Sequence, residues 1–297
     1  MIELTQMNKG LLLVLIMFST ILNFLTKSKT VFAENINYSS SLGVTLVEEF
    51  PTEENLAKLR LFDFPVNIFV AAKNITEFRR VEGELKKYST VKTAGYWPTL
   101  EIEEGYWLSA FSKREGIERV IGEINSVDSP ISVLWDAELP HLRKRLFLTE
   151  IPRFLGNREI IRNFIGDPPK NVTLYVAENR RRWPIYNWFL KIFAVTFVPD
   201  LKYNRVEMLY GQLSPEMERR LLNNGVATSK NYYPAFGITA EGIGEKPNGK
   251  NWMRISPKIL SEQLNIAKKF GIKSVVIYRL GGIDKEYLEV IKKYLKI

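Results

Sequence analysis

The sequence has no cysteine and a single histidine among its 297 residues, and both shortages exclude kinds of function. Without cysteine, the chain has no disulfide scaffold and no zinc site built from thiolates. A single histidine excludes phosphodiester cleavage by two histidines and a His-x-x-x-His metal site, because both need two histidines. We therefore expect carboxylates to carry any acid–base chemistry, with no cofactor and no metal ion.

A nucleotide-binding loop is also absent, because no Gly-x-Gly-x-x-Gly or phosphate-binding motif follows any predicted strand. Apolar residues, in contrast, are plentiful: 45% of the chain is hydrophobic and 25% is charged, which is enough to bury a core. The length fits two domains, or one α/β barrel of about 250 residues.

The first 33 residues have the layout of a secretory signal peptide. The apolar run Leu11–Leu25 follows Lys9, and small or β-branched residues precede a cleavage position after Ala33. Fifteen apolar residues are fewer than the roughly twenty that a bilayer-spanning helix needs. We therefore expect a signal peptide over residues 1–33 rather than a retained anchor, and a secreted or cell-surface protein.

Export changes the interpretation of the net charge of +9, because exported proteins rarely meet nucleic acid. Residues 1–33 contain three Lys and one Glu, which leaves +7 for the remainder. We expect a polysaccharide or an anionic cell-envelope polymer as partner, no nucleic acid, and membrane contact only if the signal segment is retained. The alternative is a merely solvated surface, including the clusters Arg143–Arg145 and Arg180–Arg182.

From Gly43 onward, short β-rich runs alternate with helical stretches. Strands are predicted at Gly43–Phe50, Val66–Ala72, Val91–Trp97, Ile131–Glu138, Asn171–Ala177, Val206–Tyr210, Tyr232–Ile238 and Ser274–Leu280. Helices are predicted at Thr52–Phe62, Thr76–Tyr88, Ser112–Ile124, over a long region ending at Phe164, and at Trp183–Phe193, Pro215–Asn223, Pro257–Phe270 and Asp284–Leu295. This count predicts a single (β/α)8 TIM barrel over residues 34–297, with an open doubly wound sheet as the competitor.

In a (β/α)8 barrel the active groups lie at the carboxyl ends of the strands. The fourth predicted strand ends in Asp136-Ala137-Glu138, and residues two apart on a strand share a face, here the barrel interior. Two carboxylates held together resist joint ionisation, so one is pushed toward a protonated, acid-competent state. The alternative is a rim pair that forms salt bridges with Arg279 or Lys92.

Aromatic residues crowd the same end, where their flat faces suit sugar rings. They are Tyr96, Trp97, Tyr106 and Trp107 in one segment, and Trp252 near the last loop of this end. Trp135 is expected to point outward by strand alternation and to pack against a helix. His141 is expected to be a rim residue rather than a catalyst.

On these residues the chain resembles the family 18 glycoside hydrolases, which are chitinase-like (β/α)8 enzymes. The family's fourth strand ends in Asp-x-x-Asp-x-Asp-x-Glu and its sixth carries Met-x-Tyr-Asp; this chain has Asp136-Ala137-Glu138 and Met208-Leu209-Tyr210. Its last strand, followed by Gly281-Gly282, is also similar. The departures are Ile131 and Leu134 for two acids, Gly211 for the final Asp, and Tyr278 for a tryptophan.

The resemblance implies an exported glycoside hydrolase that cleaves a polysaccharide or oligosaccharide of amino sugars. Glu138 would protonate the glycosidic oxygen, Asp136 would orient the substrate's acetamido group for attack on the anomeric carbon, and Tyr210 would hydrogen-bond that group. Further substrate contacts are expected from Tyr96, Trp97, Trp107, Met208, Tyr278, Glu49 and Glu178.

Three alternatives remain open. Glu49 or Glu178 could be a second acid opposite Glu138, where a separation of about 5–5.5 Å implies retention and about 6.5–9.5 Å inversion. The residues Leu134 and Gly211, which replace acids, fit a carbohydrate-binding barrel without catalysis. An oxygen-ligated metal ion for hydrolysis could be held by Glu48, Glu49, Asp136 and Glu138.

Overall fold

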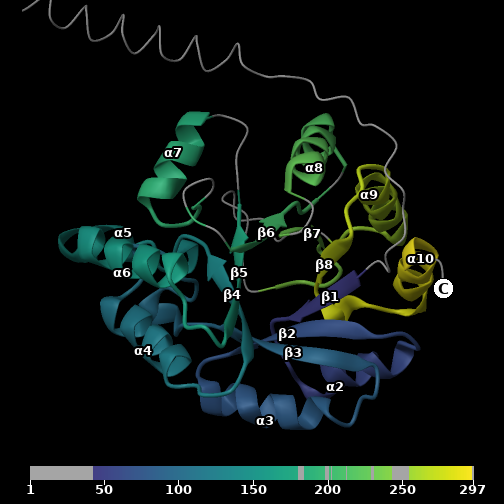
Figure 1. Cartoon of the computed structure of the whole chain (residues 1–297), viewed down its shortest axis with the longest axis horizontal. Helices are drawn as coiled ribbons and strands as arrows, with labels where there is room; N and C mark the ends of the chain where they lie inside the picture. Colours follow the sequence, from purple (N-terminus) through teal and green to yellow (C-terminus); the bar gives the residue numbers. More distant parts are fainter. Residues whose placement is uncertain are drawn as a thin grey trace, which may run out of the picture. The chain divides into compact units, whose positions relative to one another are not determined.

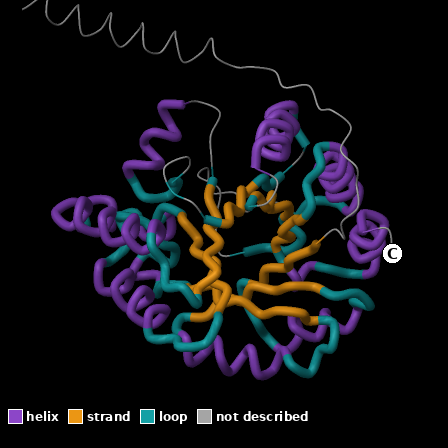
Figure 2. The backbone as a smooth tube through the Cα atoms, viewed as in Figure 1, coloured by secondary structure: helices purple, strands orange, loops and turns teal. Residues whose placement is uncertain are grey.

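The β-rich runs of the sequence form eight parallel strands that close into a barrel. The structure, a computed structural model, describes residues 43–179, 184–197, 201, 203–211, 213–228, 231–242 and 254–295. Each strand pairs with its neighbours in chain order, and β1 (Gly43–Glu48) pairs with β8 (Ser274–Tyr278) to close the ring. The strands lie inside and the helices outside (Figures 1 and 2). The predicted (β/α)8 barrel is confirmed, and the open sheet is wrong.

The predicted strands agree with the observed ones to within two residues at each end. The remaining strands are β2 (Val66–Ala72), β3 (Val91–Pro98), β4 (Ile131–Ala137), β5 (Val172–Glu178), β6 (Asn204–Met208) and β7 (Tyr232–Gly237). Their Val-, Ile- and Tyr-rich composition suits strands that are covered on both faces.

Helices follow the strands at the predicted places. They are α2 (Glu53–Ala57), α3 (Ile75–Leu85), α4 (Arg114–Asn125), α5 (Leu146–Thr149), α6 (Phe154–Gly166), α7 (Pro184–Ile192), α8 (Pro215–Thr228), α9 (Pro257–Lys269) and α10 (Lys285–Leu295). Side-chain caps fix several starts: Thr52 Oγ1 accepts from the backbone N–H of Asn55 at 3.2 Å, and Asn74 Oδ1 from that of Glu77 at 2.8 Å.

The long helical region predicted before Phe164 is wrong as a single helix. It consists of a 3₁₀ turn at His141–Arg143, the short α5, a second 3₁₀ turn at Ile151–Arg153, and then α6. Pro152 interrupts it, because proline has no N–H to donate within a helix. The predicted helix Thr52–Phe62 likewise tightens into a 3₁₀ turn after Ala57.

Alternate strand residues point into the barrel and form a small apolar cluster of Val47, Phe69, Ala71, Trp97, Leu134, Ala177, Val206, Ala235 and Val276. The residues between them join the larger core between sheet and helices. Phe69 needs glycine beside it, since a Cβ at Gly95 would lie 2.4 Å from the Phe69 ring. This alternation decides which strand residues reach the barrel mouth.

The loop between β3 and α4 lies beside the carboxyl end of β4. β3 and β4 pair only at Gly95–Tyr96 with Ser132–Val133. Further along, the carbonyl of Asp136 accepts a hydrogen bond from the N–H of Leu108 at 3.1 Å. This backbone contact holds the loop next to Asp136.

The predicted signal peptide, residues 1–33, lies outside the described residues. Within the described part of the chain, no helix is both long and apolar enough to cross a bilayer.

Candidate active site

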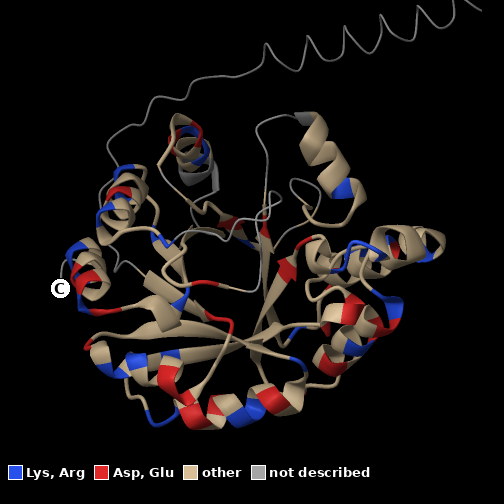
Figure 3. Cartoon of the chain, turned by 180° about the vertical axis from the view of Figure 1, so that it is seen from behind, with Lys and Arg blue, Asp and Glu red and all other residues tan. Residues whose placement is uncertain are grey.

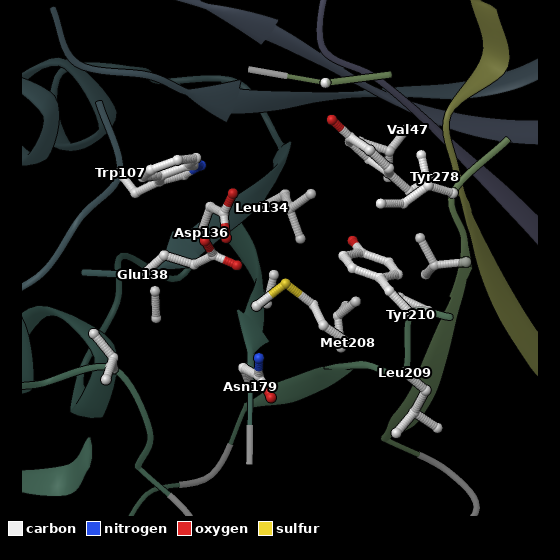
Figure 4. A pocket seen from close by; sticks show the side chains of 18 of the residues that line it. Val47, Trp107, Leu134, Asp136, Glu138, Asn179, Met208, Leu209, Tyr210 and Tyr278 are labelled. Carbon is white, nitrogen blue, oxygen red and sulfur yellow. The ribbon is translucent and has the colours of Figure 1, made fainter. Parts of the chain in front are cut away.

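Asp136 and Glu138 lie together at the carboxyl end of β4, on the interior face that strand alternation predicts. Both line a pocket of about 970 Å³. Figure 4 places the two carboxylates on one wall, with Met208 and Tyr210 from the end of β6 facing them. The structure therefore brings these four residues together around one cavity, which the predicted residues Glu49, Trp97, Trp107 and Tyr278 also line.

The Asp136 carboxyl is strongly perturbed by its surroundings in the pocket. Burial raises the pKa of this carboxyl well above the usual range, and the neighbouring carboxylates of Glu138 and Glu49 raise it further, while the Trp97 indole opposes the shift. Asp136 Oδ1 has no hydrogen-bond partner among the described residues. A proton-retaining carboxyl with an unpaired oxygen in a cavity is suited to bind a polar group of a ligand.

Glu49 is a third carboxylate at this end, one residue beyond β1. Its side chain accepts from the hydroxyl of Tyr106 at 3.0 Å and from the hydroxyl of Tyr278. Burial and the Glu49 charge raise the pKa of both tyrosines far above neutrality, so both hydroxyls remain donors. Glu49 is thus held in place as a pocket-lining charge that acts on Asp136.

Tyr210 contributes a phenol opposite the β4 carboxylates (Figure 4). Burial raises its pKa well above 10, and the charges of Asp136, Glu138 and Glu49 add to the shift. Its ring lies 5.5 Å from that of Tyr278, measured between centroids. The hydroxyl therefore stays protonated and can donate to a ligand.

Two tryptophans complete the aromatic lining. Trp97 comes from the inward face of β3, and Trp107 from the loop that follows. The loop turns at Gly105, whose φ of +124° is unfavourable for any residue with a side chain. Ser112 then donates from its hydroxyl to the Trp107 carbonyl at 2.7 Å, which fixes the tryptophan at the pocket edge.

The prediction that Tyr96 contacts substrate is wrong. Its side chain is fully buried in the outer core, where its ring lies 5.3 Å from that of Phe78 on α3. Its hydroxyl donates to Glu123 on α4 at 3.4 Å. The physical reason is strand alternation: Trp97 points inward, so its neighbour Tyr96 must point outward.

The prediction that Glu178 contacts substrate is also wrong, and so is the alternative that it lies opposite Glu138. Ala177 is the inward residue at this end of β5, and Glu178 is buried between the sheet and the helices. There its carboxylate pairs with Arg205 at 2.7 Å and accepts from the Thr196 hydroxyl at 2.5 Å. Arg205 also pairs with Glu207 at 2.9 Å, so these groups form an outer ionic network.

Glu48 points away from the pocket. The alternative of a metal site formed by four carboxylates, Glu48 among them, is therefore wrong. Glu48 Oε1 pairs with Arg279 at 2.6 Å, and Glu48 Oε2 accepts from the N–H of Gly281 at 2.6 Å. Arg279, the partner expected for a rim pair with Asp136, is therefore bound to Glu48 instead. Among the described residues, no cluster of three or more His, Asp or Glu side chains has metal-binding geometry.

Trp135 is confirmed as an outward residue, fully buried with its ring 5.2 Å from that of Phe164 on α6. His141 lines the exposed edge of the pocket, as a rim residue would. Two other predictions, Trp252 and Arg180–Arg182, lie outside the described residues.

Sequence reasoning missed the pocket wall next to β5 and α7. Asn179, Tyr186 and Leu190 line the cavity there. Tyr186 and Leu190 are four residues apart on a predicted helix and so share a face, which was a usable signal. Arg220 on α8 also lines the cavity and donates to Glu207 at 2.8 Å, a contact that no local pattern indicated.

Solved structures include similar barrels. A spore cortex-lytic enzyme of Bacillus cereus, SleL, has a TM-score of 0.51 and 10% identity over 87% of this chain and 76% of that chain. A Chromobacterium violaceum chitinase has a TM-score of 0.46 and 11% identity over 86% of this chain and 100% of that chain. A class V chitinase from Nicotiana tobaccum, in complex with NAG4, has a TM-score of 0.47 and 10% identity over 87% and 99%.

No family model and no curated protein matches the sequence. The structural likeness to SleL, at this low identity, establishes the fold alone, which is a (β/α)8 barrel.

Proposed function

We propose that this protein is an exported glycoside hydrolase that cleaves a polysaccharide or oligosaccharide of amino sugars. The observation that carries the proposal is the pair Asp136 and Glu138 on one wall of a cavity (Figure 4), which Trp97 and Trp107 also line. Acids provide proton transfer, and aromatic rings stack on sugar faces. The resemblance of the β4 and β6 ends to family 18 supplies the substrate class.

Glu138 is the general acid in this proposal. It follows β4 and is half-buried, whereas Asp136 lies deeper with 7% of its surface exposed. The Glu138 carboxyl is therefore the more accessible of the two, and the proposal places the leaving sugar next to it. The acid gives its proton to the glycosidic oxygen as the bond from that oxygen to the anomeric carbon breaks.

The nucleophile is the acetamido oxygen of the substrate itself. Asp136, through its unpaired Oδ1, accepts from the acetamido N–H, and Tyr210 donates to the acetamido oxygen from across the cavity. Glu49 is unsuited to attack because Tyr106 and Tyr278 both donate to it. Substrate assistance is a known exception to the two-carboxylate scheme of glycosidases.

Glu49 has a supporting part in this mechanism. Leu134 stands where the family pattern has an acid two residues before Asp136, so β4 itself supplies no charge there. The charge of Glu49, one residue beyond β1, raises the pKa of Asp136 instead. A negative neighbour thus acts on Asp136 from a different part of the barrel rim.

Export belongs to the proposal as well. Residues 1–33 form a signal peptide that is cleaved before Glu34, and residues 34–297 form the mature barrel domain. The support is the basic start, the apolar run Leu11–Leu25 and the small residue at the exit. The protein is then secreted or held at the cell surface, where an amino-sugar polymer of the envelope is accessible.

Hydrolysis of chito-oligosaccharides and peptidoglycan fragments tests the proposal. We expect Glu138→Gln to lower kcat by about 10²–10⁴-fold, the usual contribution of a general acid. Glu159→Gln, the same change at an exposed position of α6, is the matched control and should leave kcat unchanged. Equal activity of Glu138→Gln and the wild type would overturn the assignment.

A second candidate is a carbohydrate-binding barrel without catalysis. Leu134, 3% exposed on the pocket wall, and Gly211 favour it, since both stand in place of acids. Calorimetry that finds saturable saccharide binding without any product release would support this candidate. Turnover that depends on Glu138 would exclude it.

A further inference from the structure

One surface of the barrel exposes large apolar side chains that nothing in the described chain covers. It is formed by α5, the 3₁₀ turn before α6, the start of α6, and α7. Its members, here called the apolar surface, are Leu148, Ile151, Leu155, Ile185, Tyr186, Trp188 and Phe189, and they are between 42% and 73% exposed. Contiguous patches of this kind mark contact sites for partners or membranes.

A cluster of half-buried phenylalanines links the elements that carry the two halves of the apolar surface. Phe111 lies 5.0 Å from Phe147 of α5, 4.8 Å from Phe154 of α6 and 5.3 Å from Phe193 after α7, measured between ring centroids. Phe189 of α7 stacks on Phe193 at 6.2 Å. Residues far apart in the sequence thus present one face.

Positive charge accompanies this face. Residues 139–165 and 184–197 contain seven Lys and Arg against two Glu, and one of those two, Glu150, is buried. The cations Arg143, Lys144 and Arg145 are all exposed at the start of the segment. The α7 helix carries one basic residue, Lys191, and no acid; in Figure 3 it is tan apart from one blue position.

We propose that the apolar surface docks on an anionic lipid bilayer. Exposed apolar side chains enter the acyl boundary, Trp188 and Tyr186 have the amphipathic rings that favour the membrane interface, and the flanking cations meet anionic headgroups. A second copy of the chain fits less well, because a symmetric contact would press this cation-rich face against itself.

Docking in this way places the pocket next to the bilayer. Tyr186 belongs to the apolar surface and also lines the cavity, and Leu190 of the same helix lines it too. The edge of the cavity at α7 would then lie at the membrane surface. This inference rests on the surface alone and not on the proposed hydrolysis.

The absence of cysteine gives a direct test in the full-length chain. Single variants Leu155→Cys and Trp188→Cys carry an environment-sensitive fluorophore, with Leu222→Cys on α8, another exposed apolar position, as the matched control. The probes are vesicles of phosphatidylglycerol and phosphatidylcholine in equal parts, containing a nitroxide-labelled lipid. Each label reports bilayer contact at its own position. The comparison between labels therefore does not depend on whether residues 1–42 also bind the bilayer.

We expect a blue shift and several-fold stronger quenching at positions 155 and 188 than at position 222. Combining Arg143→Gln, Lys144→Gln and Arg145→Gln should reduce quenching at position 155 several-fold, whereas Lys86→Gln, Lys87→Gln and Lys92→Gln together, on the exposed α3–β3 side, should not. Equal quenching at the three labels would overturn the proposal. So would a blue shift that depends on protein concentration without vesicles, which would identify a second copy as the occupant.

Discussion

Asp136 is a carboxyl that the fold encloses among apolar side chains and two other carboxylates. Alternation along β4 predicts its inward direction and that of Glu138, and the outward direction of Trp135. The same rule, applied to Trp97 and Ala177, would have placed Tyr96 and Glu178 outside the barrel. The contact of Tyr106 and Tyr278 with Glu49 had no local signal, since these residues come from three separate segments.

Replacing Asp136 by Asn should stabilise the protein at neutral pH. The folded state raises the pKa of this carboxyl, so the native protein binds its proton more tightly than the unfolded chain does. The wild type is therefore predicted to lose stability as the pH rises. The loss begins near the pKa of Asp136 in the unfolded chain, about 4, and continues up to the higher pKa of Asp136 in the folded protein. The melting temperature of Asp136→Asn, followed across pH, should fall less over that range and exceed the wild-type value at pH 7.

Glu49→Gln should reduce the loss of stability with rising pH that Asp136 causes, and it does so with a side chain of nearly the same size. Because the Glu49 charge raises the pKa of Asp136, its removal lowers that pKa. The decline of stability with pH should then end at a lower pH, as followed by melting temperature. In the Asp136→Asn background the Glu49→Gln substitution should no longer move the profile; a shift of the same size there would contradict the coupling.

At the level of elements, hydrophobic alternation and turn residues were sufficient to predict the eight strands to within two residues. The single long helix before Phe164 failed because Pro152 divides it into short turns. The course of the β3–α4 loop was not predictable, since it depends on a backbone hydrogen bond from Leu108 to Asp136 on another strand. Contacts between distant segments are invisible to local patterns.

An ionic network joins β5 and β6 on the outer face of the barrel, and we expect it to be essential to stability. Arg205, whose side chain is 8% exposed, pairs with Glu178 and Glu207, which are 0% and 1% exposed. Arg205→Met leaves buried charge without its partner, and we expect a loss of about 3–5 kcal/mol in the free energy of unfolding. Urea denaturation measures this loss.

The control for this loss is an exposed ion pair. Arg80 on α3 pairs with Glu84, and their side chains are 62% and 36% exposed. Arg80→Met should cost less than about 1 kcal/mol, because solvent screens such pairs. Equal losses for Arg205→Met and Arg80→Met would contradict a buried network.

For the whole molecule, eight strand–helix units were enough to predict a closed barrel. The closure itself adds a contact that the sequence did not reveal: Glu48 at the end of β1 pairs with Arg279 directly after β8, between the two neighbouring strands that close the barrel. The apolar surface was equally hidden, because it joins α5, α6 and α7 through phenylalanines that are distant in sequence.

Export makes a prediction for the whole chain. Expressed in a secreting bacterial host, the protein should be recovered outside the cytoplasm with Glu34 as its first residue, because the proposed cleavage position follows Ala33. Intact-mass spectrometry and N-terminal sequencing measure this. Recovery of the uncleaved chain from the cytoplasm alone would contradict export.

The most direct test of the central claim, that Glu138 is the acid of a glycosidase, compares two leaving groups. An aryl chitobioside has a leaving oxygen that needs little protonation, whereas a chito-oligosaccharide has a sugar hydroxyl that needs full protonation. We predict that Glu138→Gln lowers kcat/KM on the oligosaccharide by about 10²-fold or more, and far less on the aryl glycoside. Equal losses on both substrates, or no turnover of either by the wild type, would contradict the account.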